Sequence, residues 1–435
     1  MSCRLLLVLP NPIQVRHYRL KLAKTLFPPL GLLTLAAHTP PDFDLRLLDE
    51  SVHWLDYNTP ADLVAISTNT ASAPRAYEIA SEFRRRGVKV VIGGIHATAM
   101  PEEALRYTDA VGIGECEGYW PQLCQDFLSG KLQPQYRSEH LPDLSQLPVP
   151  RRDLINPKDY YLPRTLQTSR GCPFRCSFCS VHKFFGGKYR MHPVGAVLEE
   201  IKSMPGKSPL IFVDDNIFGD QQRSQELVEA VRPLGENWFG QASMISLQDE
   251  EFLRQAGEAG CRMLFVGVES LSEENLKDIN KRFNKPAEMK EAIARCHRCG
   301  IGVIGAFIVG LDYDEVSVFE RIVDFALDAR LDAVQIAIRI PIPGTEDCAA
   351  LTPRIFDWDY RKRDGSRAVF FHEHIQPPVL MEEKLQWAYQ QLYCKQGIRQ
   401  RLSGHSGPHL SFTRKMNQGF ALRASKWLRR LALEI

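Results

Sequence analysis

Three cysteines lie within eight residues in the segment Thr168-Ser169-Arg170-Gly171-Cys172-Pro173-Phe174-Arg175-Cys176-Ser177-Phe178-Cys179. Three thiolates on one short loop can hold three irons of a cubane iron–sulfur cluster, which normally takes four cysteines. Because no fourth cysteine is nearby in the sequence, one iron is expected to stay open to a ligand, as in catalytic metal sites. The alternative is a zinc site with a distant fourth ligand such as His182, although zinc motifs usually pair two C-x2-C units.

Strand-like runs and helical patterns alternate on both sides of this segment. The first predicted strand of the second series overlaps the start of the segment, and the others follow it. These strands are Thr165–Ser169, Leu210–Asp214, Trp238–Met244, Met263–Glu269, Gly302–Val309 and Ala333–Ile340. Before it, they are Leu5–Pro10, Leu45–Leu48, Leu63–Ser67, Val88–Gly93 and Ala110–Ile113. Such alternation predicts parallel sheets. Six βα units are too few for a closed eight-stranded barrel. We therefore predict an α/β chain in which a Rossmann-like doubly wound sheet precedes a partial (β/α)6 TIM-type barrel and a small helical region.

Prolines mark the expected boundary between the two sheets. Five of them lie between Leu141 and Arg164, at positions 142, 148, 150, 157 and 163. Proline at this density favours extended backbone and excludes helix. The predicted division is a Rossmann-like domain at 1–140, a linker at 141–164, a barrel at 165–345 and a partly helical C-terminal region at 346–435.

Composition excludes several classes of protein. The 435 residues include 54 basic and 52 acidic side chains, a formal charge of +2, which provides no overall field for a polyanion. We therefore expect no nucleic-acid partner. No apolar run reaches the roughly 20 residues of a membrane helix, and Leu5–Leu9 is too short for a signal-peptide core. The eleven unevenly spaced cysteines argue against a disulfide framework, so we expect a cytoplasmic chain.

The cysteine segment resembles the radical S-adenosylmethionine (radical SAM) enzymes, whose signature is C-x3-C-x2-C with an aromatic residue before the last cysteine, here Phe178. Thr168–Gly171 and the six-strand series are also similar, so the resemblance covers about residues 165–345. It implies a [4Fe-4S] cluster at Cys172, Cys176 and Cys179, whose open iron binds S-adenosylmethionine (SAM). An electron from the cluster would cleave the sulfonium to a 5′-deoxyadenosyl radical, and the electron donor would be of the flavodoxin or ferredoxin type. The implied SAM contacts are Phe178, Asp214, Asp215, Gln241, Ser243 and Glu269.

The first domain resembles the cobalamin (B12)-binding domain of the B12-dependent radical SAM class. The matching features are Pro28–Gly31, Gly93–His96, Gly112–Glu115 and Trp120. Glycines at strand ends suit close backbone approach to a large planar ligand. The implied cobalamin contacts are Ser67, Thr68, Gly93, Gly94, His96, Gly114 and Glu115. The D-x-H-x-x-G motif whose histidine ligates cobalt in classical B12 domains is absent, which leaves His96 as a candidate ligand or the cobalt without a protein ligand.

Within this class, the pattern is most similar to the branch that includes the hopanoid C-2 methylases, partly through a loop with Pro341, Pro343, Gly344 and Thr345, in which Arg339-Ile340 replaces the usual residues. The resemblance implies methylation of an unactivated carbon in a small-molecule or lipid-like substrate. One alternative is a cyclase or rearrangement enzyme of the same architecture without methyl transfer. A second is a non-catalytic cobalamin carrier or sensor, although a sensor needs no open iron. No pattern identifies a residue that acts on the substrate.

Two further patterns invite a functional reading. His297 lies between Cys296 and Cys299, but without a partner pair we favour buried thiols on an amphipathic helix over a metal site. From Phe412 to Ile435, apolar residues recur at spacings of three and four among basic side chains. This helix is expected either to pack on the core or to contact a membrane surface peripherally.

Overall fold

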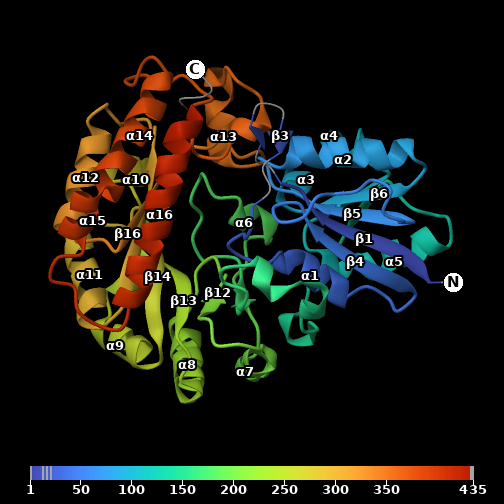
Figure 1. The fold of residues 1–435 in the computed structure, drawn as a ribbon, viewed down its shortest axis with the longest axis horizontal. Helices are drawn as coiled ribbons and strands as arrows, with labels where there is room; N and C mark the ends of the chain where they lie inside the picture. The colour runs from blue at the N-terminus through green and yellow to red at the C-terminus, as the bar shows by residue number, and fades with distance from the viewer. Residues whose placement is uncertain (1, 12–13, 16–17, 20–21, 432–435) are drawn as a thin grey trace.

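The N-terminal half is a six-stranded parallel sheet with helices on both faces (Figure 1). The computed structural model describes all residues except 1, 12–13, 16–17, 20–21 and 432–435, and the side chains of 12–21 and 423–435 are also outside the description. The strand order is β4-β1-β5-β6-β7-β8. The bounds are β1 (Cys3–Leu9), β4 (Phe43–Asp49), β5 (Leu63–Ser67), β6 (Lys89–Gly93), β7 (Ala110–Ile113) and β8 (Gln135–Arg137), with a separate small pair, β2 (Gln14–Val15) and β3 (Tyr18–Arg19).

Apolar side chains of β1 point alternately to the two faces of the sheet, which explains why helices cover both faces. Leu5 and Leu7 pack with α1 (Leu30–Ala37) and α5 (Trp120–Leu128). Leu6 and Val8 point to the opposite face. There they pack with α2 (Ala73–Arg85), α3 (Ile95–Ala99) and α4 (Pro101–Leu105). The connection from β1 leads to β4 on one side, whereas the connection from β5 leads to β6 on the other side. The carboxyl ends of the strands beside such a switch point form the usual ligand site.

The second half is an open, parallel six-stranded sheet in the order β16-β15-β14-β13-β12-β9. Its strands are β9 (Thr165–Leu166), β12 (Leu210–Phe212), β13 (Trp238–Ser243), β14 (Cys261–Glu269), β15 (Gly302–Val309) and β16 (Ala333–Ile338). The intervening helices are α7 (Val194–Ser203), α8 (Gln221–Val231), α9 (Glu250–Glu258), α10 (Glu273–Asp278), α11 (Pro286–Arg298) and α12 (Val318–Asp328). This is the predicted partial barrel, so the predicted fold class is confirmed.

The first predicted barrel strand, Thr165–Ser169, breaks into two pieces. Its first two residues join the sheet as β9, whereas β10 (Ser169–Arg170) leaves it and pairs antiparallel with β11 (Arg190–Met191). The small helix α6 (Val181–Phe184) lies between the cysteines and β11, and Figure 1 shows it between the two sheets. The break therefore lifts the cysteine loop off the sheet edge and toward the N-terminal domain.

The C-terminal region is mostly helical and covers one side of the barrel (Figure 1). It contains α13 (Glu346–Leu351), α14 (Val379–Tyr393), α15 (Lys395–Arg401) and α16 (Leu410–Leu431). Helix α14 packs on α12 and β16, and α16 packs on α14 and β16. Among the described residues, no helix has the length and apolarity needed to cross a membrane. The segment between the sheets carries three short 3-10 helices at Leu144–Gln146, Arg152–Leu154 and Pro157–Asp159.

Candidate active site

The three clustered cysteines lie on the loop that follows β10. Cys172, Cys176 and Cys179 are partly buried free thiols. Burial, with a smaller effect of the neighbouring thiols, raises the pKa of Cys176 to about 11 and that of Cys179 to about 12. Three thiols that destabilise one another's ionised form suit a bound cation that takes all three as thiolates. The donor set therefore fits an iron–sulfur cluster.

A fully buried carboxylate holds the start of this loop. Asp214 Oδ1 accepts from the Thr168 amide at 3.0 Å, from the Thr168 hydroxyl at 2.9 Å and from the Ser169 hydroxyl at 2.5 Å. Asp214 is completely inaccessible to solvent. Its contacts explain the break between β9 and β10, because they replace sheet hydrogen bonds at the point where the chain turns away. Its predicted contact with SAM stays a prediction, since the described bonds position the loop.

Polar atoms without partners face the cysteines from the residues that follow Asp214. Asp215 Oδ2 and both side-chain polar atoms of Asn216 are buried and make no described hydrogen bond. Burial, then the charge of Asp214, raises the pKa of Asp215 to about 7. Buried polar groups normally have partners, so these atoms suit an absent polar group beside the cluster, such as the SAM amine.

The strongest backbone signal in the site is at Glu269, which ends β14 with a positive φ of 65°. Non-glycine residues rarely adopt this conformation except at functional sites. Glu269 Oε1 lies 2.5 Å from Nζ of Lys281, and the pair is almost fully buried. The charges of Glu269 and Cys176 overcome the effect of burial and raise the pKa of Lys281. A side chain at Gly267 would place its Cβ 2.2 Å from Glu269 Oε1, so this glycine leaves room for the carboxylate.

The other predicted SAM residues lie around the same end of the sheet. Gln241 and Ser243 are on β13, and the Ser243 hydroxyl lies 3.0 Å from that of Ser246. Phe178 packs against the barrel core from the cysteine loop. The structure thus brings Phe178, Asp215, Gln241, Ser243 and Glu269 to the carboxyl end of the barrel, but it does not test their contacts with SAM.

A cavity of about 290 Å³ opens between the N-terminal sheet and the cysteine loop. Its lining includes five of the predicted cobalamin residues, Ser67, Gly93, Gly94, Gly114 and Glu115. From the barrel side it is lined by Gln167, Arg170, Phe184, Phe185 and Val213. A Cβ atom added at Gly31 or Gly114 would meet nothing within 4 Å, so these two positions border open space. Such a glycine-edged cavity at the switch point fits a large planar cofactor.

Two predicted cobalamin residues do not line this cavity. His96 is buried on α3, where Nε2 lies 3.1 Å from the Tyr77 hydroxyl and its ring contacts Tyr360 edge-on. The Thr68 hydroxyl bonds to Asn69 O and the Ser72 hydroxyl. No histidine is among the described residues that line the cavity, and a contact of His96 with cobalt stays a prediction.

The protein's own backbone requires a glycine at position 94. Gly94 has φ of 98°, and a Cβ there would lie 2.6 Å from the Thr68 carbonyl oxygen. The backbone of Thr68 therefore already excludes a side chain at Gly94, and its contact with cobalamin stays a prediction. Gly93 has ordinary space, with its nearest neighbours at 3.7 Å.

Buried ion pairs join the two halves of the site. Arg170 Nη1 lies 2.6 Å from Glu115 Oε2, and Arg170 Nη2 lies 2.5 Å from Glu117 Oε1. Arg190, on β11, also bonds to Glu115. The side chains of Arg170, Glu115 and Glu117 are 8%, 2% and 5% exposed. Although burial opposes ionisation of Glu117, Arg170 lowers its pKa. Because Arg170 is two residues from Cys172, these ion pairs connect the cavity wall directly to the cysteine loop.

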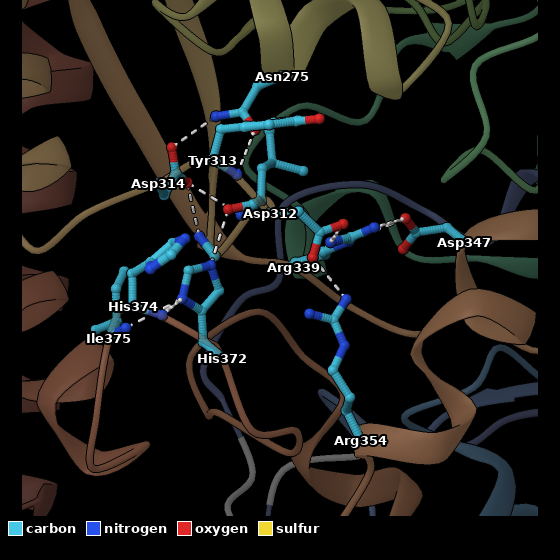
Figure 2. Close-up of polar contacts among 12 residues, drawn as sticks. Asn275, Asp312, Tyr313, Asp314, Arg339, Asp347, Arg354, His372, His374 and Ile375 are labelled. Atoms are coloured by element: carbon cyan, nitrogen blue, oxygen red, sulfur yellow. Dashed lines mark hydrogen bonds and ion pairs between the residues drawn. The ribbon is translucent and has the colours of Figure 1, made fainter.

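A second polar network lies where β15 and β16 end (Figure 2). Arg339 contacts Asp347 Oδ1 at 2.5 Å and Asp312 Oδ2 at 3.0 Å, and Arg354 contacts Asp312 Oδ1 at 2.6 Å. The Asp347 amide donates to the carbonyl of Ser177, between two of the cysteines. Arg339 is buried, whereas Arg354 and Asp312 are about one-third exposed. The network therefore runs from the cysteine loop to the open mouth of the barrel.

Sequence reasoning missed several of these residues. Lys281 follows a left-handed Asn280 and belongs to no recognisable motif. Arg170 was part of the quoted segment, yet nothing in the sequence paired it with Glu115 and Glu117, more than fifty positions earlier. These contacts are recognisable only from the burial of the paired charges in the folded chain, which the sequence does not indicate.

Comparisons with known proteins agree with this geometry. The radical SAM superfamily profile matches residues 166–326, and the B12 binding domain profile matches residues 20–123. The chain is 30% identical to bacteriochlorophyllide d C-12(1)-methyltransferase of Chlorobaculum tepidum over 392 residues, covering 86% of this chain and 85% of the relative. It is 25% identical to the hopanoid C-2 methylase of Rhodopseudomonas palustris over 387 residues, covering 83% and 71%. The fold matches the radical SAM methyltransferase TsrM of Kitasatospora setae, solved with cobalamin and a [4Fe-4S] cluster, with a TM-score of 0.72, 16% identity and coverage of 99% and 100%.

Proposed function

Because the chain belongs to the cobalamin-dependent radical SAM methyltransferases, we propose that it methylates an unactivated carbon of a large, polycyclic and mostly apolar substrate. The observation that carries this proposal is the cavity shared by the N-terminal sheet and the cysteine-loop side of the barrel. Methyl transfer to a substrate radical requires the two cofactors to face one substrate, and Arg170 lines this cavity two residues from Cys172. The relatives named for bacteriochlorophyllide and hopanoid methylation both act on large ring systems.

The cysteine loop and the strand ends around it would hold the iron–sulfur cluster and SAM. Cys172, Cys176 and Cys179 are the proposed cluster ligands, and Glu269 with the unpartnered Asn216 is proposed to bind the polar groups of SAM. When bound, the cluster supplies the electron that cleaves SAM, and cobalamin supplies the methyl group. The chain itself places the groups and excludes water through the buried ion pairs of Arg170.

The cavity glycines and the loop after β7 are proposed to hold cobalamin. Gly31, Gly93 and Gly114 leave space at the edge of the cavity, and Glu115 is fixed by Arg170 and Arg190. The described lining holds no histidine, so the cavity would hold cobalamin through its glycine edges and Glu115, and a contact with His96 stays a prediction.

The mouth of the barrel supports an apolar substrate with an acidic substituent. Phe356 and Phe371 are 44% and 51% exposed and contact each other with ring centroids 4.8 Å apart. A backbone bond joins this pair to the end of the short 3-10 helix Thr352–Arg354, because Phe371 N donates to Arg354 O. An exposed aromatic surface beside a guanidinium that is about one-third exposed suits a flat ring system that carries a carboxylate.

The reaction needs an external electron for the cluster, as is general for the radical SAM superfamily. We propose a donor of the flavodoxin or ferredoxin type and no nucleic-acid partner. Arg175 and Lys183, which are exposed beside Cys176 and Cys179, suit an acidic protein surface. Peripheral membrane contact through the basic part of α16 stays a prediction, since the side chains from Arg423 onward are outside the described residues.

Methyl-labelled SAM tests the proposal. The reconstituted enzyme should transfer the label to a chlorin-type or hopanoid-type compound in a defined panel of such substrates. Substrate that is consumed without gaining the label would contradict methyl transfer and favour a cyclase or a rearrangement. Binding of cobalamin without any cleavage of SAM would favour a carrier or sensor.

One matched pair of variants tests the cobalamin site. Gly31→Leu should abolish bound cobalamin while leaving the iron content unchanged, because Gly31 is helical, exposed and borders the cavity. Leucine also favours helix over glycine by roughly 1 kcal/mol, so loss of folding is not expected. Gly195→Leu, on the exposed face of α7 with nothing within 4 Å, is the control and should retain cobalamin. Retention of cobalamin by Gly31→Leu would contradict the assigned cavity.

A further inference from the structure

A cluster of histidines around one aspartate lies at the end of the barrel opposite the cysteine loop. Asp332 directly precedes β16, and His297 is near the end of α11. His405 and His409 lie in the loop that joins α15 to α16. Four side chains from three separate parts of the chain therefore converge at the amino end of β16, where none of them belongs to the site described above.

The spacing of the ligand atoms suits a tetrahedral metal ion. His297 Nε2 lies 3.0 Å from Asp332 Oδ2. His405 Nδ1 and His409 Nε2 lie 3.5 Å and 3.6 Å from Asp332 Oδ1. Ligand bonds of 2.0–2.1 Å at tetrahedral angles require donor atoms roughly 3.3 Å apart. The ligand atoms of His297, Asp332 and His405 all lie within 4.8 Å of one another, so these three donors are grouped around one point, and His409 joins them through its contact with Asp332.

Ring nitrogens in this cluster lack hydrogen-bond partners although they are buried. Nε2 of His405 and Nε2 of His409 make no described hydrogen bond, and these side chains are 3% and 1% exposed. Leaving such a group unpaired costs about 1–3 kcal/mol. A bound cation at the centre would take Nε2 of His409 and Nδ1 of His405 as ligands.

The surrounding bonds orient the donors as they are oriented in metal sites. His409 Nδ1 lies 3.2 Å from the Gly300 carbonyl oxygen, to which it can only donate. In the neutral ring, Nε2 is then a lone-pair acceptor that faces the Asp332 carboxylate, and two acceptors repel unless a cation lies between them. The Thr413 hydroxyl and the Val303 amide donate to Asp332 Oδ1 and Oδ2 at 2.8 Å and fix the carboxylate. Such outer hydrogen bonds commonly accompany metal-bound histidine and carboxylate.

We propose that His297, Asp332, His405 and His409 bind a structural zinc ion. Three imidazoles and one carboxylate form a closed donor set, which is typical of structural rather than catalytic zinc. The ion would fasten the α15–α16 loop to the barrel and so hold α16 on α14 and β16. The site is separate from methyl transfer, and its test does not depend on that activity.

Metal analysis of the anaerobically purified full-length holoenzyme tests this site. We expect about one zinc per chain in addition to the cluster iron, with zinc X-ray absorption showing only nitrogen or oxygen neighbours at about 2.0–2.1 Å. Zinc misplaced at the cysteine loop would instead show sulfur at about 2.3 Å, and that result would overturn the proposal. So would zinc below about one-tenth of an equivalent per chain, which would leave protonated histidines as the partners of Asp332.

Variants then assign the ligands. His405→Ala and His409→Ala should each lower zinc at least tenfold without changing the iron content, whereas His374→Ala, an exposed histidine, should change neither. If the ligand variants fail to fold, zinc removal from the wild-type enzyme still tests the structural role of the ion. Removing zinc with a chelator should lower the enzyme's thermal midpoint, and added zinc should restore it. A midpoint that does not change on removal and return of zinc would contradict the structural role.

Discussion

Replacing Arg170 by leucine removes the guanidinium that joins the cavity wall to the cysteine loop. Glu117 then loses its ion pair at 2.5 Å, and within the described part of the chain it has no other. Glu115 keeps its bond to Arg190. Removing one partner of a buried ion pair costs about 3–5 kcal/mol, because the remaining charge stays desolvated. For a domain of this size we expect the thermal midpoint to fall by roughly 6–20 °C.

Three comparison variants separate the buried charge from other effects. Arg190→Leu should cost less than Arg170→Leu, because both glutamates retain Arg170. Adding Glu117→Leu to Arg170→Leu should recover part of the loss, since removing both partners leaves no unpaired charge. Arg151→Leu is the control: its ion pair with Asp153 is 46% and 60% exposed, so its loss should cost at most about 1 kcal/mol.

Thermal unfolding followed by circular dichroism, and the cobalamin content of the same reconstituted samples, measure the outcome. The loop Gly114–Glu117 lines the cavity, so Arg170→Leu should also retain less cobalamin. The reasoning would be refuted if Arg170→Leu unfolded at the wild-type temperature and bound cobalamin to the wild-type extent. It would also be refuted if Arg151→Leu were as destabilising as Arg170→Leu.

Two other predictions concern the cluster. Alanine at any of Cys172, Cys176 or Cys179 should abolish the iron–sulfur absorbance near roughly 400 nm and the cleavage of SAM. Cys296→Ala should leave the iron content unchanged, because that thiol is buried in the barrel core. SAM cleavage at the wild-type rate by any of the three loop variants would contradict the assignment. Asp214→Ala should lower iron per chain severalfold, since three donors at the start of the cysteine loop lose their acceptor; unchanged iron would mean that the loop holds its shape without Asp214.

Sequence reasoning predicted the fold class because both sheets are parallel and repeat one unit. The apolar runs of β5 and β6, buried on both faces, are recognisable without any tertiary information. The break between β9 and β10 was not predictable. It depends on Asp214, which is forty-five residues away from Ser169 in the sequence and meets it only in the folded chain.

The parts of the candidate site that lie in short sequence motifs were predictable from the sequence, and those that depend on contacts between distant residues were not. The three cysteines lie within eight residues of sequence, and Gly93 and Gly114 lie at the ends of predictable strands. His96 also ends a predictable segment, but α3 turns its ring toward Tyr77 and Tyr360, a direction that depends on contacts with residue 360. The Glu269–Lys281 pair similarly depends on a left-handed backbone that no composition rule predicts.

The central claim is that one chain holds a radical SAM cluster and cobalamin on facing sides of one cavity. The most direct measurement is the content of iron, acid-labile sulfide and cobalamin in a single anaerobically reconstituted preparation. The account predicts about four irons, about four sulfides and about one cobalamin per chain. A preparation that turns over SAM and its substrate with a full cluster, yet retains no cobalamin under any reconstitution, would contradict it.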